Sequence, residues 1–253
     1  AICLGAGNRE TASKAATHGL ALSGLHGVIL TIGCILVMPG FLALFTGDAD
    51  VIDLGIRYST IVFLFATINT LNLAYEKIFQ GVGKMKITMI GLLVGCVSNI
   101  ILDPLLIFGL GPFPALGIEG AALATGLGQS IPAIAGLIFF FTNKKGLCFT
   151  RFRVKVGDFF HACYNGSSEM VSQLAAAIIT FLFNSVMMRL AGANGVAAIT
   201  IILYGEFLFN SFHLGFAVGI APIVGFQYGA QNKAQLKRIY KTTFIFVVVS
   251  SVV

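Results

Sequence analysis

Six apolar segments, each close to the length that crosses a lipid bilayer, recur along the chain. They lie at residues 19–45, 55–79, 87–110, 118–142, 167–190 and 196–228. A seventh apolar run begins near residue 240. A spanning helix needs about 20 consecutive apolar residues, since its backbone groups find no water in lipid and must satisfy one another. Only 10% of the residues are charged, against roughly 25% in soluble domains. The sequence therefore predicts an all-α, polytopic transmembrane helical bundle.

Basic residues are distributed unevenly over the loops between these segments. When successive loops are assigned to alternate sides, 14 of the 16 Lys and Arg residues fall on one side, and only Arg57 and Arg189 fall on the other. Because positive charge collects on the cytoplasmic side, we assign the richer side to the cytoplasm. The basic residues form short clusters in loops rather than one basic face, so the net charge of +6 does not indicate nucleic-acid binding.

Two loop sequences resemble each other and indicate an internal repeat. LGAGNRETASK begins at Leu4 and YGAQNKAQLKR begins at Tyr228, and each follows the cytoplasmic end of an apolar run. An even number of spans separates them, which favours a parallel duplication over a chance match. We expect residues 1–143 to be the remainder of an N-terminal bundle, 144–165 a cytoplasmic linker, and 166–253 the start of a C-terminal bundle. Since the chain starts at Ala1 and stops inside an apolar run, we expect it to be an internal part of a longer protein.

Asp103 is a carboxylate inside the apolar run VSNIILDPLLIFGLG and needs partners or a function there. Asn99 lies one helical turn earlier, and Pro104 leaves a carbonyl of the preceding turn without its N–H partner. The next span enters from the opposite direction and places Thr125 at a similar depth. These oxygens suit Na⁺, or a proton shared with water. The alternative is a protonated aspartic acid that only joins helices by hydrogen bonds.

A second polar face occurs in ILYGEFLFNSFHLGF. Glu206, Asn210 and His213 follow i, i+4, i+7 spacing and therefore share one side of a helix. This stripe is suited to lining an aqueous cleft that binds protons or a cationic substrate, and equally suited to an interhelical hydrogen-bonded seam. Glu76 follows a similar stripe, but its neighbour Lys77 and its place near the membrane surface predict a solvated ion pair. We expect Glu169 to lie at the membrane interface.

Other motifs predict packing rather than chemistry. The glycine pairs Gly91–Gly95 and Gly215–Gly219 are typical of closely packed helices in lipid. Ser23 and His26 share a helix but lack an oxyanion loop and a residue that orients the histidine, so we predict no enzyme.

Two long stretches of the chain resemble a known family. The run beginning EKIFQGVGKMKITMIGLLVGCVSNIILDPLLIFGLG, together with GVAAITIILYGEFLFNSFHLGFAVGIAPIVGFQYGAQ, is similar to multidrug and toxin extrusion (MATE) transporters. The resemblance implies a twelve-helix protein of two six-helix bundles, with this chain holding the end of helix 2 to the start of helix 9. It also implies that Asn99 and Asp103 on helix 5 and Thr125 on helix 6 form a cation site, to which a helix 1 aspartate outside this chain contributes. Another branch of the family has a carboxylate midway along helix 7, where this chain reads QLAAAIITF.

The resemblance implies a cation-coupled antiporter of the bacterial cytoplasmic (inner) membrane that exports amphipathic, often cationic organic compounds. Na⁺ or H⁺ would be the coupling ion, with no other cofactor, and the full-length protein would be a monomer in contact with lipid. The alternative is a lipid-linked oligosaccharide flippase of related architecture, which a cleft rich in Arg and Lys would favour. A channel is a third possibility, and its conductance would far exceed carrier rates.

Overall fold

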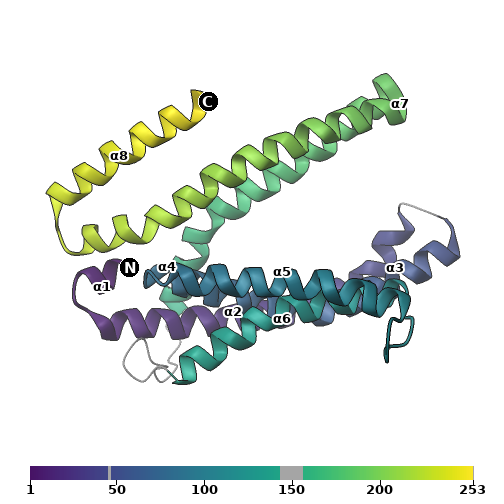
Figure 1. Ribbon diagram of the computed structural model, residues 1–253, viewed down its shortest axis with the longest axis horizontal. Coiled ribbons are helices and arrows are strands. Elements are labelled where there is room, and N and C mark those ends of the chain that lie inside the picture. The colour runs from purple at the N-terminus through teal and green to yellow at the C-terminus, as the bar shows by residue number, and fades with distance from the viewer. Residues whose placement is uncertain (45–46, 143–155, 253) are drawn as a thin grey trace. The chain divides into compact units, whose positions relative to one another are not determined.

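The computed structural model of the chain describes residues 1–44, 47–142 and 156–252, and every regular element there is a helix (Figure 1). The helices in order are α1 (Ile2–Gly5), α2 (Arg9–Ala43), α3 (Ala49–Leu64), α4 (Ala66–Gly81), α5 (Met85–Phe108), α6 (Ile118–Thr142), α7 (Val156–Gly229) and α8 (Lys233–Val252). The predicted all-α fold is confirmed. Helix α7 is two helices joined at Gly192, whose φ of 61° and ψ of −150° are not helical.

Five helical segments are long and apolar enough to cross a membrane. They are Arg9–Ala43, Met85–Phe108, Ile118–Phe139, Cys163–Gly192 and Asn194–Gly229. A sixth span results if α3 and α4, which meet at a bend of 42°, are counted as one. These correspond to the six predicted segments. Helix α8 begins at Lys233 rather than near residue 240, and it is not among the segments that are long and apolar enough to cross a membrane.

Local side chains and glycines determine where several helices begin and end. The Asp48 carboxylate accepts a hydrogen bond from the Asp50 backbone N–H (3.0 Å) and so caps the start of α3. Helix α5 ends at Phe108 and is capped by Gly109, whose φ of 70° is left-handed and therefore favours glycine. Apolar side chains remain exposed along the helices, as for Leu36 of α2 at 75% exposure, which is what contact with lipid requires.

The chain forms two compact units. The first consists of Ala1–Phe152 with Pro222–Ile239, and the second of Arg153–Ala221 with Tyr240–Val253. Within the first unit α5 packs along α6, α2 packs on α3 and α4, and α6 also contacts α3 and α4. Its core contains Leu20, Tyr75 and Phe79. Most of the predicted linker, 144–155, lies outside the described residues, and the remainder of it is helical in α7.

The two similar loop sequences have the same local structure. Asn8 and Asn232 each accept a hydrogen bond at Oδ1 from the backbone N–H three residues further on, at 3.0 and 3.1 Å, and so cap α2 and α8. The residue before each asparagine has a positive φ, 76° at Gly7 and 54° at Gln231. The two turns thus share one local conformation, and the parallel duplication stays a prediction.

Glycines let α5 and α6 approach closely. A Cβ added to Gly95 would lie 2.7 Å from the Gly128 carbonyl oxygen, and one added to Gly91 would lie 3.2 Å from Pro132 Cβ. The packing surface predicted at Gly91–Gly95 is therefore confirmed. A Cβ at Gly215 or at Gly219 would meet nothing within 4 Å in the part of the chain that the structure describes.

Candidate cation site

The contact between α5 and α6 determines the relative depth of the predicted ligands. A Cβ added to Gly128 would lie 3.0 Å from Asn99 Cβ, so the α6 backbone lies directly against Asn99. At the other end of the contact, a Cβ added to Gly120 would touch the Leu106 carbonyl and lie 3.0 Å from the backbone nitrogen of Ile107. The two helices are therefore antiparallel, and later residues of α5 lie beside earlier residues of α6.

Asp103 and Thr125 come to the same level because each lies between these two contacts. Asp103 is partly buried, and no hydrogen bond or ion pair joins its carboxylate to any described residue. Thr125 Oγ1 donates a hydrogen bond to the Ala121 carbonyl (3.0 Å), which leaves its oxygen lone pairs available. The structure thus places Asn99, Asp103 and Thr125 along one helix pair, at depths that match the prediction.

The donor set fits a small hard cation. Asp103 supplies a carboxylate, Asn99 an amide oxygen and Thr125 a hydroxyl, and Pro104 lies inside α5, where it frees a backbone carbonyl. No group of three or more His, Cys, Asp or Glu side chains that could hold a metal ion occurs in the described ranges. A site with one carboxylate and neutral oxygens suits Na⁺ or a proton better than a divalent or soft metal ion.

The predicted stripe on α7 exists and is partly hydrogen-bonded along its own helix. Asn210 Nδ2 donates to Glu206 Oε1 at 3.5 Å, and both side chains are exposed. His213 Nδ1 lies 3.1 Å from the Phe209 carbonyl oxygen. Glu206 and Asn210 therefore remain accessible, whereas His213 is partly buried.

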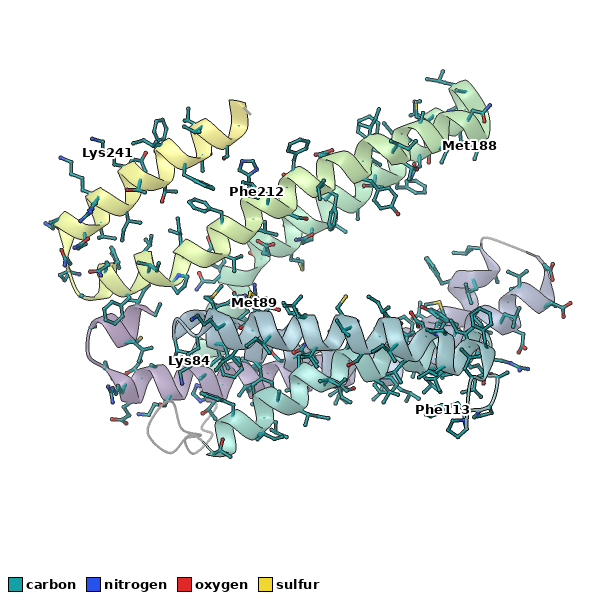
Figure 2. All side chains as sticks on the ribbon, viewed as in Figure 1. Lys84, Met89, Phe113, Met188, Phe212 and Lys241 are labelled. Carbon is teal, nitrogen blue, oxygen red and sulfur yellow. The ribbon has the colours of Figure 1, made fainter. Side chains whose placement is uncertain are left out.

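His213 also lies at the contact between α7 and α8, within the second unit. Its Nε2 is 3.3 Å from Ser250 Oγ. Beside it Phe246 stacks on Phe212 at a centroid distance of 6.0 Å and on Phe216 at 3.9 Å (Figure 2). At His213 the structure thus favours the interhelical seam over the aqueous cleft, and Ser250 is a partner that the sequence did not reveal.

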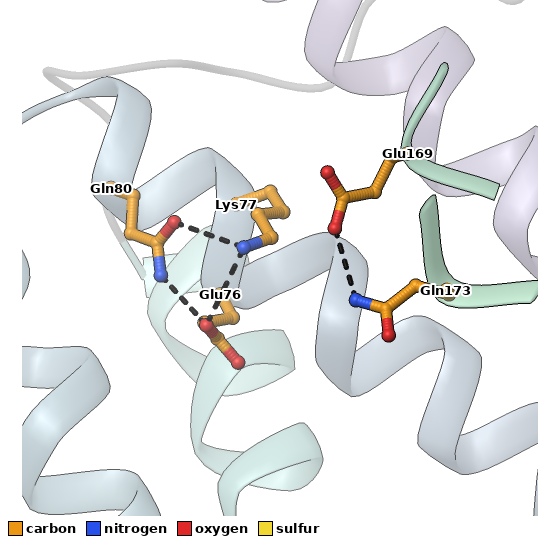
Figure 3. Close-up of polar contacts among 5 residues, drawn as sticks. All are labelled: Glu76, Lys77, Gln80, Glu169 and Gln173. Carbon is orange, nitrogen blue, oxygen red and sulfur yellow. Dashed lines mark hydrogen bonds and ion pairs between the residues drawn. The ribbon is translucent and has the colours of Figure 1, made fainter. Parts of the chain in front are cut away.

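The ion pair predicted between Glu76 and Lys77 is present, but its lysine is exposed and its carboxylate is mostly buried. The Glu76 side chain is only 19% exposed, whereas Lys77 is 64% exposed and its Nζ lies 3.9 Å from Glu76 Oε1. The short contact comes instead from Gln80, whose Nε2 donates to Glu76 Oε1 at 2.7 Å (Figure 3). Glu169 is exposed and accepts a hydrogen bond from Gln173 Nε2 at 3.1 Å.

A group of ion pairs between α3 and the start of α6, within the first unit, supports the assignment of loops to sides. Arg57 Nη2 lies 2.8 Å from Asp53 Oδ2, and its Nη1 lies 3.8 Å from Glu119 Oε1. The loop charges place Arg57 on the side poor in Lys and Arg, and the same alternation of loops puts Asp53 and Glu119 there. Their contact shows that they do share one side.

Five to six helical segments that are long and apolar enough to cross a membrane define an integral membrane protein. A sequence model of the MatE family matches residues 1–105 and 170–253, and the chain therefore belongs to the MatE family of multidrug and toxin extrusion transporters. It is a protein of the bacterial cytoplasmic membrane.

Relatives and solved structures agree with this family. The chain is 25% identical over 248 residues to the multidrug export protein MepA of Staphylococcus aureus (strain MRSA252), covering 93% of this chain and 50% of the relative. It is 27% identical over 205 residues to MepA of Staphylococcus haemolyticus (strain JCSC1435), covering 76% and 42%.

Solved structures of similar fold align with 99% of the chain at 26% sequence identity. A crystal structure of MATE in the bent conformation has a TM-score of 0.89, with 56% of that structure covered. The outward-facing conformation of a multidrug resistance MATE family transporter has a TM-score of 0.88, with 55% covered. The chain spans about half the length of the curated relatives it matches.

Proposed function

We propose that this chain works as part of a cation-coupled antiporter that exports amphipathic, often cationic organic compounds, with Na⁺ or H⁺ flowing inward. The observation that carries this proposal is Asp103, a partly buried carboxylate within a spanning helix, level with Thr125 and near Asn99. A carboxylate at that depth is costly and is therefore expected to serve a function. The names of the relatives, multidrug export proteins, support the class of substrate.

In this mechanism Asp103 alternates between a cation-bound and a free state. A bound Na⁺ or proton would neutralise the carboxylate, and Asn99 and Thr125 would supply neutral oxygen ligands. The ion drives exchange only if its affinity differs between the two conformations of the transporter, because a ligand that binds both equally shifts no equilibrium. We expect the gradient, rather than a chemical reaction, to supply the energy.

The exposed pair Glu206 and Asn210 would contact the exported compound. A carboxylate with a neighbouring amide attracts a cation without binding it tightly, which suits release on the other side. Lys and Arg are almost absent from the spans, and this favours the export of cations over the flipping of an anionic lipid-linked sugar.

Efflux from membrane vesicles tests the proposal. Vesicles that contain the intact gene product would be loaded with a fluorescent cationic dye, and a sodium gradient or a pH gradient would be imposed separately. Asp103→Asn should abolish gradient-driven efflux, since it preserves shape but removes the charge. Asp50→Asn removes a charge from an exposed first turn of α3 and should leave efflux unchanged. Wild-type efflux and ion dependence in Asp103→Asn would refute the assignment.

A further inference from the structure

A small cavity lies between α4, α5 and α6, within the first unit. Its walls include Asn72, Tyr75 and Glu76 of α4, and Thr88 and Gly91 of α5. The room available to a water-sized occupant is about 20 Å³. One water needs about 10–15 Å³ by the same measure, so the cavity admits one water or one small ion and excludes an organic compound.

Three polar side chains around this cavity have unused hydrogen-bonding or ligating capacity. Thr88 Oγ1 is buried without a hydrogen-bond partner. Glu76 uses Oε1 for Gln80 and Lys77, and no described residue contacts its Oε2 by a hydrogen bond or ion pair. The Asn72 amide likewise has no hydrogen bond to the described part of the chain. Of the three, the Thr88 hydroxyl is the fully buried group, and buried polar groups normally have partners. Asn72 and Glu76 are partly buried at the same cavity and would offer oxygen ligands to an occupant.

The charge around the cavity is that of a cation site. Glu76 and Tyr75 are the ionisable side chains among the described lining residues. Lys77 is mostly exposed and 3.9 Å from the carboxylate, and Lys84 lies over the Phe139 ring at 4.3 Å (Figure 2). Helix α6 contributes no ionisable residue to the walls, and α2 lines none of the cavity. The Glu76 carboxylate therefore has one long ion pair, from Oε1 to the exposed Lys77, and its Oε2 has no cation partner among the described residues.

This cavity is separate from the candidate site at Asp103. Thr88 precedes Asn99 by eleven residues on α5, which at 1.5 Å per residue is about 16 Å along the helix. The cavity lies nearer the end of the bundle that the loop charges assign to the cytoplasm. An ion that travels inward from Asp103 would therefore reach Glu76 afterwards.

We propose that Glu76, Thr88 and Asn72 form a second binding site for a small monovalent cation, either Na⁺ or a proton carried with one water. Carboxylate, hydroxyl and amide oxygens are ligands that suit both. The role of this site as a second binding position for the inward-moving coupling ion rests on the proposed antiport. Binding of the ion can be measured without transport.

The test measures the heat-unfolding midpoint of the purified, intact gene product while sodium replaces choline at constant ionic strength, at several pH values. An Asp103→Asn background removes the other site. In that background we expect the unfolding midpoint still to depend on sodium or on pH. Glu76→Gln should remove this dependence. Thr88→Val should weaken the apparent affinity for the cation by about tenfold, as expected for one lost ligand. Lys77→Gln is the matched control and should retain the dependence or strengthen it, because it removes a nearby positive charge.

If Glu76→Gln removes a sodium dependence of the unfolding midpoint, the occupant is Na⁺. If the midpoint depends on pH but not on sodium, and Glu76→Gln removes the pH dependence, the occupant is the proton. The inference is overturned if Asp103→Asn shows neither response, or if Lys77→Gln acts like Glu76→Gln. If Glu76→Gln does not fold, Thr88→Val alone decides, since threonine and valine have nearly the same shape. Dye efflux by the wild-type protein, measured in parallel, tests the proposed function independently of this result.

Discussion

The contact between Gly95 and Gly128 should be the most sensitive packing position in the first unit. A Cβ added at Gly95 would lie 2.7 Å from the Gly128 carbonyl oxygen, and one added at Gly128 would lie 3.0 Å from the Gly95 carbonyl oxygen and 3.0 Å from Asn99 Cβ. Both positions are buried, so neither α5 nor α6 can accept a methyl group without moving. Each single alanine therefore forces the same two helices apart.

The expected loss follows from two opposing effects. Overpacking a closely packed contact costs about 1–3 kcal/mol, whereas alanine in place of glycine within a helix gains about 0.5–1 kcal/mol. We expect Gly95→Ala and Gly128→Ala each to destabilise by about 1–2 kcal/mol. Because the first alanine already separates the helices, the double variant should lose less than the sum of the two single losses.

Heat unfolding of the purified protein in detergent measures these losses, and a double-mutant cycle measures their coupling. Gly33→Ala is the control, because Gly33 is an exposed glycine of α2 where a Cβ would meet nothing within 4 Å. It should be neutral or slightly stabilising. Equal stability of Gly128→Ala and Gly33→Ala, or strictly additive losses, would show that α5 and α6 do not approach as described. Gly128→Ala should also weaken the ion dependence, since it displaces Asn99.

Three further outcomes are expected. Thr125→Ala should reduce the sodium or pH dependence of efflux less than Asp103→Asn does, because it removes a neutral ligand rather than the charge. Gln231→Gly should raise the free energy of unfolding by about 0.4–1 kcal/mol, since the φ of 54° there is strained for glutamine, and chemical or thermal unfolding measures the gain. The Lys14 side chain lowers the pKa of the exposed Glu10 carboxyl, first by its hydrogen bond and then by its charge. This small stabilisation of the folded state is present above the ordinary glutamate pKa and is lost as pH falls through the lowered pKa. Lys14→Met should therefore differ from the wild type in acid-dependent unfolding only at pH values above the lowered pKa.

The number and positions of the spans could be predicted because lipid imposes a minimum length of apolar sequence. The interruption between α3 and α4 could not. The segment 55–79 is continuously apolar around Phe65, yet the helix bends by 42° there. Hydropathy reports which solvent a segment prefers and carries no information about backbone dihedral angles.

The depth of the candidate site could be predicted for a related reason. Two helices joined by a short loop are antiparallel, so counting residues from the loop gave the level of Asp103 and of Thr125. The contact of His213 with Ser250 had no such guide. These two residues are 37 positions apart, on helices whose relative rotation depends on how Phe212 and Phe246 pack.

Glu76 shows how sequence adjacency misleads inside a helix. Consecutive residues on an α-helix point about 100° apart, so Lys77 faces outward while Glu76 faces α5, and the true neighbours of Glu76 are Gln80 one turn on and Thr88 across the cavity. The basic residue next in sequence forms only a long ion pair with the carboxylate, at 3.9 Å. Glu76 and Thr88 line one cavity, and neither Glu76 Oε2 nor the buried Thr88 hydroxyl has a hydrogen-bond partner among the described residues, which is the basis for the cation proposed there.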